Sequence, residues 1–177
     1  MTPKTLFFEH QLSECKNEYE NHMSGFNLLD NKAYQVLGFS GLLLGLSVSF
    51  LQQETLDFIM QTRHSLLYLI IFSILMLLLS IITGIVSVRI IKIKGVPSHH
   101  RSTEEYEDLK PISDDKFDIE LYQNFISNKI RRWIISIENI KEANKRKAQK
   151  VFLSQLFCSM GLIIFGVIGV IIVLGNL

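Results

Sequence analysis

The sequence predicts an all-α integral membrane protein with three transmembrane helices and a cytoplasmic helical stalk. Three observations support this class: three long charge-free apolar blocks, two amphipathic segments with helical periodicity, and no stretch with the period-two alternation of strands. The 177 residues are 48% hydrophobic, and the mean hydropathy is +0.27. Because the apolar residues are concentrated in blocks, neither a typical water-soluble enzyme nor a disordered chain fits the composition.

Each apolar block is long enough to cross a bilayer as a helix. The blocks cover residues 33–51, 65–88 and 151–174, and none contains Asp, Glu, Lys or Arg. A helix rises about 1.5 Å per residue, so a hydrocarbon core needs roughly 20 apolar residues. The alternative, three buried core helices of a soluble protein, would require a domain of this size to cover three helices that are apolar on every side. We therefore expect three membrane helices.

The distribution of Lys and Arg predicts the orientation in the plasma (inner) membrane. Residues 1–32 contain three of these basic residues, residues 52–64 contain one, and residues 89–150 contain fourteen. Basic residues accumulate on the cytoplasmic side of membrane proteins. We therefore expect the N-terminus and residues 89–150 to be cytoplasmic, and the short loop 52–64 and the C-terminus to lie outside.

The two cytoplasmic segments have the periodicity of amphipathic helices that continue into the membrane. In residues 1–32, apolar positions spaced four and three apart run from Phe8 to Ala33. Residues 98–113 lack such a pattern and are expected to form a loop or a partly ordered segment. After an N-cap at Ser113, a second helix has the same spacings, continuing through Asn144, Ala148 and Val151. Two helices entering from one side can bury their apolar faces on each other.

Small residues in the first apolar block form a candidate helix-packing face. Gly41, Gly45 and Ser49 lie on one side of a helix and would permit close approach of another helix. The partner is either a second copy, which would make the protein a homo-oligomer, or the same chain, where Ser80 and Gly84 are suitable.

Charged residues beside the membrane form the candidate ligand site. Asp30 and Lys32 flank the first block, and Asp30 needs a cationic partner near anionic lipid, for which Lys145 or Arg146 is suitable. The basic run 141–150 fits contact with anionic lipid headgroups, and the alternative is an anionic cytoplasmic ligand.

No arrangement of residues indicates an enzyme, a metal site or a cofactor. The adjacent His99 and His100 beside Glu104 and Glu105 lack the spacing of known metal sites. The 18 basic and 17 acidic residues balance, so nucleic acid is not expected as a partner. The expected partner of the chain is the lipid bilayer.

Two short sequences resemble a known family. The residues DNKA at 30–33 and LGFSG at 37–41 resemble the signature that opens the first span of Pycsar-effector-type small membrane proteins, roughly Asp-x-Lys-Ala and then Leu-Gly-Phe-x-Gly. A weaker similarity to the basic last helix of that family covers 137–150. The aromatic-rich middle segment of the family is not evident in residues 98–125.

The resemblance implies a prokaryotic antiphage effector. Such a protein would respond to a cyclic nucleotide (cyclic CMP or cyclic UMP) made by a partner cyclase, and would then impair membrane integrity. By position, Asp30, Lys32, Lys145 and Arg146 would be the ligand contacts. The alternative is a non-enzymatic membrane scaffold or accessory subunit that docks a soluble partner through its cytoplasmic helices.

Overall fold

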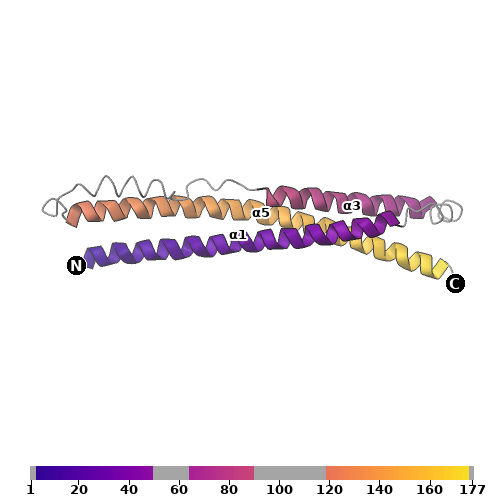
Figure 1. Cartoon of the computed structure of the whole chain (residues 1–177), viewed down its shortest axis with the longest axis horizontal. Coiled ribbons are helices and arrows are strands. Elements are labelled where there is room, and N and C mark those ends of the chain that lie inside the picture. The colour runs from indigo at the N-terminus through magenta and orange to yellow at the C-terminus, as the bar shows by residue number, and fades with distance from the viewer. Residues whose placement is uncertain (1–2, 50–63, 90–118, 176–177) are drawn as a thin grey trace. The chain divides into compact units, whose positions relative to one another are not determined.

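The computed structural model describes residues 3–49, 64–89 and 119–175. These ranges contain three helices and no strand, which confirms the all-α prediction for this part of the chain (Figure 1). The helices are α1 (Pro3–Ser49), α3 (His64–Val88) and α5 (Ile119–Gly175). The loop predicted at 52–64 lies outside the described residues except for His64, which is the first residue of α3. The segment 98–113, the histidines at 99 and 100, and the N-cap at Ser113 also lie outside them.

Helices α1 and α5 are long because nothing in their sequences interrupts them. They contain 47 and 57 residues, and proline occurs within them only at the first position of α1, where its missing N–H breaks no bond. Helix α1 continues through Gly25, where a Cβ would lie 3.8 Å from the Asn144 side chain. The predicted continuation of both amphipathic helices into apolar sequence is confirmed.

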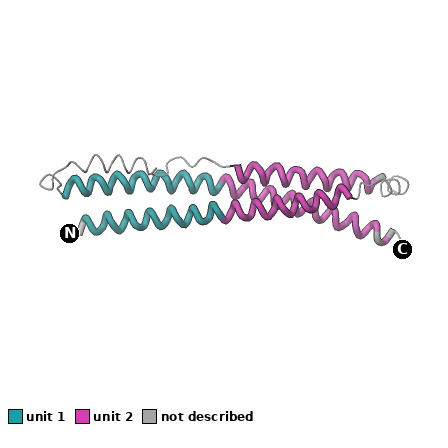
Figure 2. The backbone as a smooth tube through the Cα atoms, viewed as in Figure 1, with its two compact units in different colours: residues 1–27, 91–145 teal, residues 28–90, 146–177 magenta. Residues whose placement is uncertain are grey.

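The chain divides into two compact units (Figure 2). Unit 1 consists of residues 1–27 and 91–145, so its described helices are the first parts of α1 and α5. Unit 2 consists of residues 28–90 and 146–177, and it contains the rest of α1 and α5 and the whole of α3.

Unit 1 is a parallel pair of helices. Residues further along α1 contact residues further along α5, which is the pattern of a parallel pair. The contacts are Glu9 with Tyr122, Tyr19 with Trp133, and His22 with Asn144. At the centre, Tyr19, Ile137 and Ile140 are buried together, and the Tyr19 and Trp133 rings meet edge to face with centroids 5.2 Å apart.

Unit 2 adds α3 in the opposite direction. Along α3, Ile70 packs with Ile168, whereas Gly84 approaches Leu37 and Ser154. Residues later in α3 thus contact earlier residues of α5, so α3 is antiparallel to it. Buried α3 positions recur at spacings of four and three from Leu66 to Ser87, which is the period of a helix facing one packed side.

The interior of unit 2 is rich in small residues, and its exterior is rich in large apolar ones. Six serines are buried: Ser40, Ser47, Ser73, Ser80, Ser87 and Ser154. Gly84 and Gly161 are also buried. Large apolar side chains on the outside include Leu42, Leu46, Tyr68, Ile71, Phe72, Phe152 and Ile163, all at least 45% exposed.

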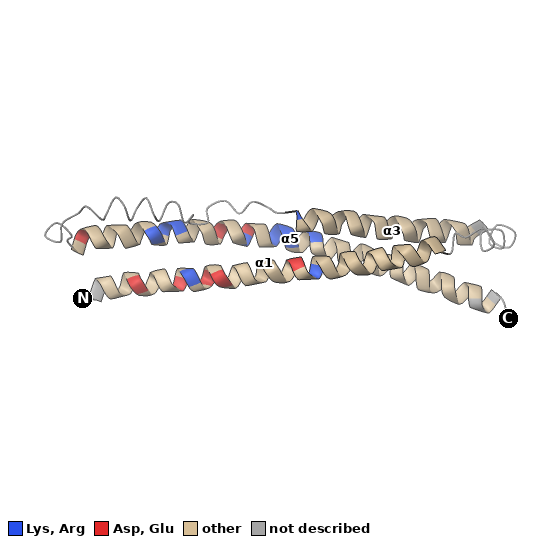
Figure 3. Cartoon of the chain, viewed as in Figure 1, with Lys and Arg blue, Asp and Glu red and all other residues tan. Residues whose placement is uncertain are grey.

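Two helices are long and apolar enough to cross a membrane: α3 over Ser65–Val88 and α5 within Ile119–Ile172. Figure 3 shows no Asp, Glu, Lys or Arg on α3, whereas the first part of α5 has charges of both signs. The apolar end of α1 is less hydropathic because Tyr34, Gln35 and several glycines and serines dilute its leucines. Whether α1 is the third span is taken up below.

Candidate functional site

A buried ion pair joins α1 and α5 within unit 2. Lys147 Nζ is paired with Asp30 Oδ1, and their side chains are 1% and 26% exposed. Apart from Lys147, Asp30 Oδ1 has no hydrogen-bond partner among the described residues. The two charges therefore compensate each other, which a buried ammonium requires because transfer from water to a protein interior costs several kcal/mol per ion.

The partner of Asp30 differs from the expected Lys145 or Arg146 because of the helical register of α5. Its buried positions run through Ile140, Ala143, Lys147 and Val151, so Lys147 points inward. Lys145 and Arg146 are exposed, and so is Ala148, which we had placed on the buried face. The sequence did contain a signal for this partner. Lys147 lies seven residues after Ile140 and four before Val151, so it continues the spacing of the buried positions.

The DNKA sequence divides between two faces of α1. Asp30 and Ala33, three residues apart, both face the interior, and Ala33 is completely buried. Asn31 and Lys32 are exposed on the other side. Asp30 thus has a structural partner, whereas Lys32 is accessible to solvent, lipid headgroups or a ligand.

The four predicted ligand contacts are not equivalent in the structure. Asp30 is engaged by Lys147, while the side chains of Lys32, Lys145 and Arg146 are exposed. Lys32 and Arg146 belong to unit 2, and Lys145 belongs to unit 1. Their role in binding a ligand stays a prediction.

A serine from each of the three helices meets at the centre of unit 2. Ser80 Oγ donates to the Ser154 carbonyl at 2.8 Å, and Ser154 Oγ donates to the Ser80 carbonyl at 2.8 Å. Ser40 Oγ lies 2.9 Å from Ser80 Oγ. Since each hydroxyl has one proton and Ser80 has already donated its own, Ser40 is the donor. The buried hydroxyls thus satisfy one another without water.

The predicted packing face of Gly41, Gly45 and Ser49 has no partner within the described chain. All three residues are exposed, and a Cβ at either glycine would meet nothing within 4 Å. The expected intrachain contact with Ser80 and Gly84 is wrong: Ser80 contacts Ser40 and Ser154 instead. The inward face of α1 is Ser40, Leu43 and Ser47, which leaves the glycines outside.

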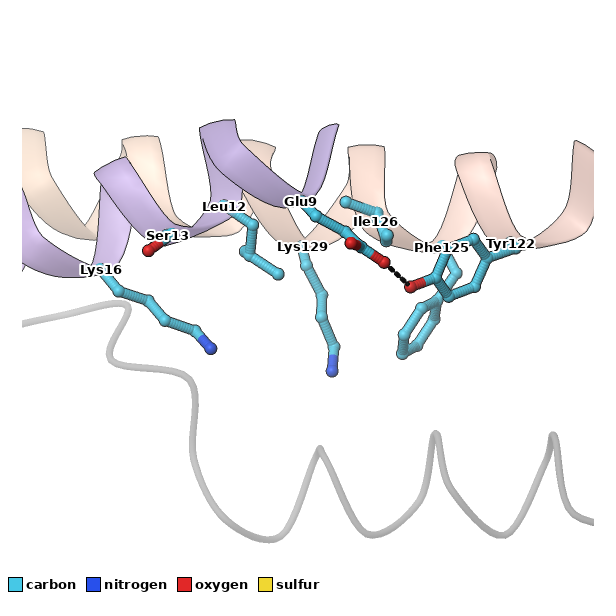
Figure 4. Close-up of a pocket in the computed structure, with 8 residues that line it drawn as sticks. All are labelled: Glu9, Leu12, Ser13, Lys16, Tyr122, Phe125, Ile126 and Lys129. Carbon is cyan, nitrogen blue, oxygen red and sulfur yellow. Dashed lines mark hydrogen bonds between the residues drawn. The ribbon is translucent and has the colours of Figure 1, made fainter. Parts of the chain in front are cut away.

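A second polar feature lies in unit 1, where Figure 4 shows an open cavity of about 220 Å³ between α1 and α5. Tyr122 donates its phenolic hydrogen to Glu9 Oε1 at 2.6 Å, and this hydrogen bond is the largest cause of a raised Tyr122 pKa. Lys16 and Lys129 extend from the same side, and Lys129 Nζ lies 4.4 Å from the Phe125 ring centroid. Two cations beside an aromatic ring can bind an anion, although the negative charge of the nearby Glu9 carboxylate weakens such binding.

Asn144 makes a further polar contact between the helices of unit 1, close to an ion pair of Lys141 with Glu18 at 3.6 Å. Its Nδ2 donates to the His22 carbonyl at 2.8 Å, and the His22 imidazole lies 3.7 Å from Glu18 on its own helix. Among the described residues, no group of three or more His, Cys, Asp or Glu side chains is arranged to hold a metal ion.

No protein-family model matches the chain, and neither a curated protein nor a solved structure is similar to it. The family resemblance therefore depends on the residues at 30–33, 37–41 and 137–150 alone.

Proposed function

We propose that the chain is a membrane effector of antiphage defence that responds to a cyclic nucleotide made by a partner cyclase and then impairs membrane integrity. The observation that carries the proposal is the ion pair between Asp30 and Lys147. These residues come from the two sequence stretches that resemble the effector family. They contact each other across the α1–α5 packing of unit 2, so the two stretches meet at one place in the fold.

The packing of unit 2 supports a location in the bilayer for all three of its helical segments. In water, burial of large apolar side chains is the main driving force for packing. In lipid that force is absent between helices, which associate instead through small residues and interhelical hydrogen bonds. Unit 2 buries six serines and two glycines beside a few leucine and isoleucine side chains, and exposes many large apolar residues, including on α1. This supports α1 as the third span.

The ion pair is suited to the control of membrane integrity. While α1 and α5 stay together, the two charges neutralise each other and the Lys147 ammonium stays buried. If the helices separate, both charges need hydration, so separation would draw water to the membrane surface of the bundle. Because α1 and α5 each contribute to both units, a ligand that changes their packing in unit 1 can act on the pair along continuous helices.

The test is the membrane potential of bacteria that express the chain with and without a pyrimidine cyclase supplying cyclic CMP or cyclic UMP. A voltage-sensitive dye should report depolarisation only when the cyclase is active. Depolarisation in both conditions would indicate an ungated toxin and contradict the proposal. No depolarisation with either nucleotide, together with recovery of a soluble partner in a mild-detergent pull-down, would favour the scaffold function.

Lys32 provides a variant in which the fold should be intact. Its side chain is exposed, so Lys32→Ala should leave expression and membrane insertion unchanged. The proposal expects this variant to abolish cyclase-dependent toxicity. Arg131→Ala is the matched control, since Arg131 is an exposed basic residue outside the basic run 141–150. Unchanged toxicity of Lys32→Ala would remove Lys32 from the ligand site.

A further inference from the structure

The cavity between α1 and α5 in unit 1 has two chemically different ends (Figure 4). Lys16 lies at one end, Phe125 and Tyr122 lie at the other, and Lys129 lies between them. The Tyr122 phenol donates to Glu9 Oε1 at 2.6 Å, which holds this carboxylate beside the aromatic rings. The cavity thus combines positive charge at one end with flat aromatic surface and a hydrogen-bond acceptor at the other.

The two lysines of the cavity lack an anionic partner. Among the residues that the structure describes, neither Lys16 nor Lys129 forms an ion pair. Lys141, by contrast, pairs with Glu18 between the same two helices. Glu20 follows Lys16 by four residues, a spacing that allows a pair, but Lys16 extends to the side of the cavity that Lys129 also faces. Two cations that face one open cavity attract an anion.

The charge and the size of the cavity restrict its ligand. Its lining has one positive charge in excess, since Glu9 offsets one of the two lysines and the other lining residues are uncharged. A phosphodiester has one negative charge and would neutralise this excess, whereas a phosphate monoester has close to two at neutral pH. The volume of about 220 Å³ lies below the roughly 300–1,000 Å³ of sites for drug-sized molecules, so the ligand is small.

We propose that this cavity binds a small phosphodiester that carries a planar ring, which is the chemistry of a pyrimidine cyclic nucleotide. Lys16 and Lys129 hold the phosphate, because hydrogen bonds between an ammonium and phosphate oxygens are charge-assisted. Phe125 and Tyr122 contact the ring, since nucleic-acid bases stack on aromatic side chains. The identification of the ligand as a cyclic nucleotide rests on the proposed function, whereas the position and chemistry of the cavity do not.

Glu9 gives the cavity a means of distinguishing the two pyrimidine bases. An ionised carboxylate only accepts hydrogen bonds. Cytosine has an exocyclic amine that donates to carboxylates, whereas uracil has a carbonyl oxygen at the same position. Cyclic CMP should therefore bind more tightly than cyclic UMP.

Binding of radiolabelled cyclic CMP to the purified full chain in nanodiscs tests the proposal. Lys16→Gln and Lys129→Gln each remove one charge and should raise the Kd at least about tenfold, because hydrogen bonds to charged groups are the stronger ones. Arg131→Gln is the matched control, since Arg131 is exposed on α5 and does not line the cavity. Circular dichroism checks that the variants keep their helix content. Unchanged binding by both lysine variants, or an equal loss in Arg131→Gln, would overturn the proposal.

A lipid headgroup is the other source of a phosphodiester. Lys16 precedes Asp30 by 14 residues of one helix, which is about 21 Å, whereas the headgroup layer of a bilayer is about 5–8 Å thick. A free nucleotide also supplies the ring that the aromatic end can contact. Nanodiscs with and without phosphatidylglycerol separate the two sources. Cyclic CMP should bind equally to both, and loss of its binding in the presence of phosphatidylglycerol would assign the cavity to a headgroup and contradict the proposal.

Glu9→Gln tests the distinction between the bases. The amide oxygen of glutamine can still accept from Tyr122, while its NH₂ group can donate to the uracil carbonyl. The variant should therefore reduce the preference for cyclic CMP over cyclic UMP, measured by competition of each unlabelled nucleotide with the labelled one. A wild-type chain without this preference, or an unchanged preference in Glu9→Gln, would overturn the role of Glu9.

The binding measurement is separable from the test of the proposed function. Binding of cyclic CMP that depends on Lys32 but not on Lys129 would overturn the cavity as the site and leave the proposed function intact. Binding that depends on Lys129, without cyclase-dependent depolarisation, would support the site and contradict the proposed function. A wild-type chain that binds no cyclic CMP would contradict the site, whatever the membrane potential shows.

Discussion

Units 1 and 2 share the helices α1 and α5 but bury different residues. In unit 1 the buried centre is Tyr19, Ile137 and Ile140, and most charged residues of both helices are exposed. In unit 2 hydrogen-bonded serines lie beside apolar clusters that include Leu43 and Leu77, and large apolar residues cover the outside. Small polar residues inside and large apolar residues outside are the arrangement that lipid favours, which fits the proposed location of unit 2 in the bilayer. The two proposed environments thus correspond to different buried residues along continuous helices.

The boundary between the two arrangements is the position of the ion pair. Asp30 and Lys147 are the first charged residues of unit 2 to face its interior, and further along α1 and α5 the buried residues are uncharged. Because this pair lies at the edge of an apolar unit, its two charges neutralise each other while they are in contact. A small displacement of the helices would expose both charges to water.

Removal of one member of the ion pair should have the largest effect on stability. Asp30→Leu leaves the Lys147 ammonium buried without its carboxylate, and breaking a buried pair typically costs about 3–5 kcal/mol. The double variant Asp30→Leu/Lys147→Leu removes both charges and should recover most of the loss. Unfolding of the purified chain in detergent, followed by circular dichroism, measures the difference. Equal instability of the single and double variants would show that the pair does not act as a unit.

Gly161 and Gly166 provide a matched pair on the same helix. A Cβ at Gly161 would lie 2.9 Å from Leu77, which is buried, so Gly161→Ala should destabilise unit 2 by about 1–3 kcal/mol through overpacking. Gly166→Ala adds a methyl group to open space and should be neutral or slightly stabilising, because alanine favours helix by about 1 kcal/mol. Thermal unfolding in one detergent compares them. The opposite order would contradict the helix packing described for unit 2.

Tyr122→Phe should weaken the outer contact of unit 1 by about 1 kcal/mol, since it removes a partly buried hydrogen bond to Glu9. Glu9 also raises the pKa of the Tyr122 phenol, so the folded state binds its proton more tightly than the unfolded state. The contribution to stability is therefore complete below the unfolded value near 10 and is lost as pH rises through the raised folded value. At pH 8 the wild type should be more stable than the variant, and the two unfolding curves should converge as pH rises above 10.

Cys15 should react slowly with alkylating reagents. Burial is the main cause of its raised pKa, and the carboxylates of Glu18 and Glu14 add to it. Because the thiolate is the reactive form, alkylation at pH 8 should be slower than that of a cysteine in an unfolded peptide. Replacing both glutamates by glutamine should increase the rate modestly. If Cys15 in the folded chain reacted as fast as the cysteine of the unfolded peptide, the packing of Cys15 beside Tyr19 would be contradicted.

The helices were predictable from the sequence because a four-and-three repeat continues along α1 and α5. Apolar positions from Phe8 to Ala33 and from Tyr122 to Ile140 are buried or partly buried, as their spacing predicts. In unit 2 the same repeat continues, but Ser and Gly occupy many of its positions beside Leu and Ile, and composition alone does not mark these small residues as an interior. This is why Gly41 and Gly45 were plausible candidates, although the inward face lies one residue away at Ser40.

The partner of Asp30 could not be found by searching for apolar residues. A lysine on an amphipathic helix is normally assigned to the solvent face, so Ala148 was the natural choice for the buried position. The structure places Lys147 there because Asp30 offers a compensating charge from the other helix. This pairing depends on two residues that are distant in sequence, so the pattern of one helix alone does not predict it.

The central claim is that α1 crosses the membrane with α3 and α5, and the position of the C-terminus tests it most directly. Alkaline phosphatase, which folds only outside the cytoplasm, can be fused after Leu177, and a cytoplasmic fluorescent reporter can be fused at the same site. With three spans and a cytoplasmic N-terminus, the phosphatase fusion should be active and the cytoplasmic reporter dark. An inactive phosphatase with a bright cytoplasmic reporter would place the C-terminus inside, as two spans require, and would contradict the account.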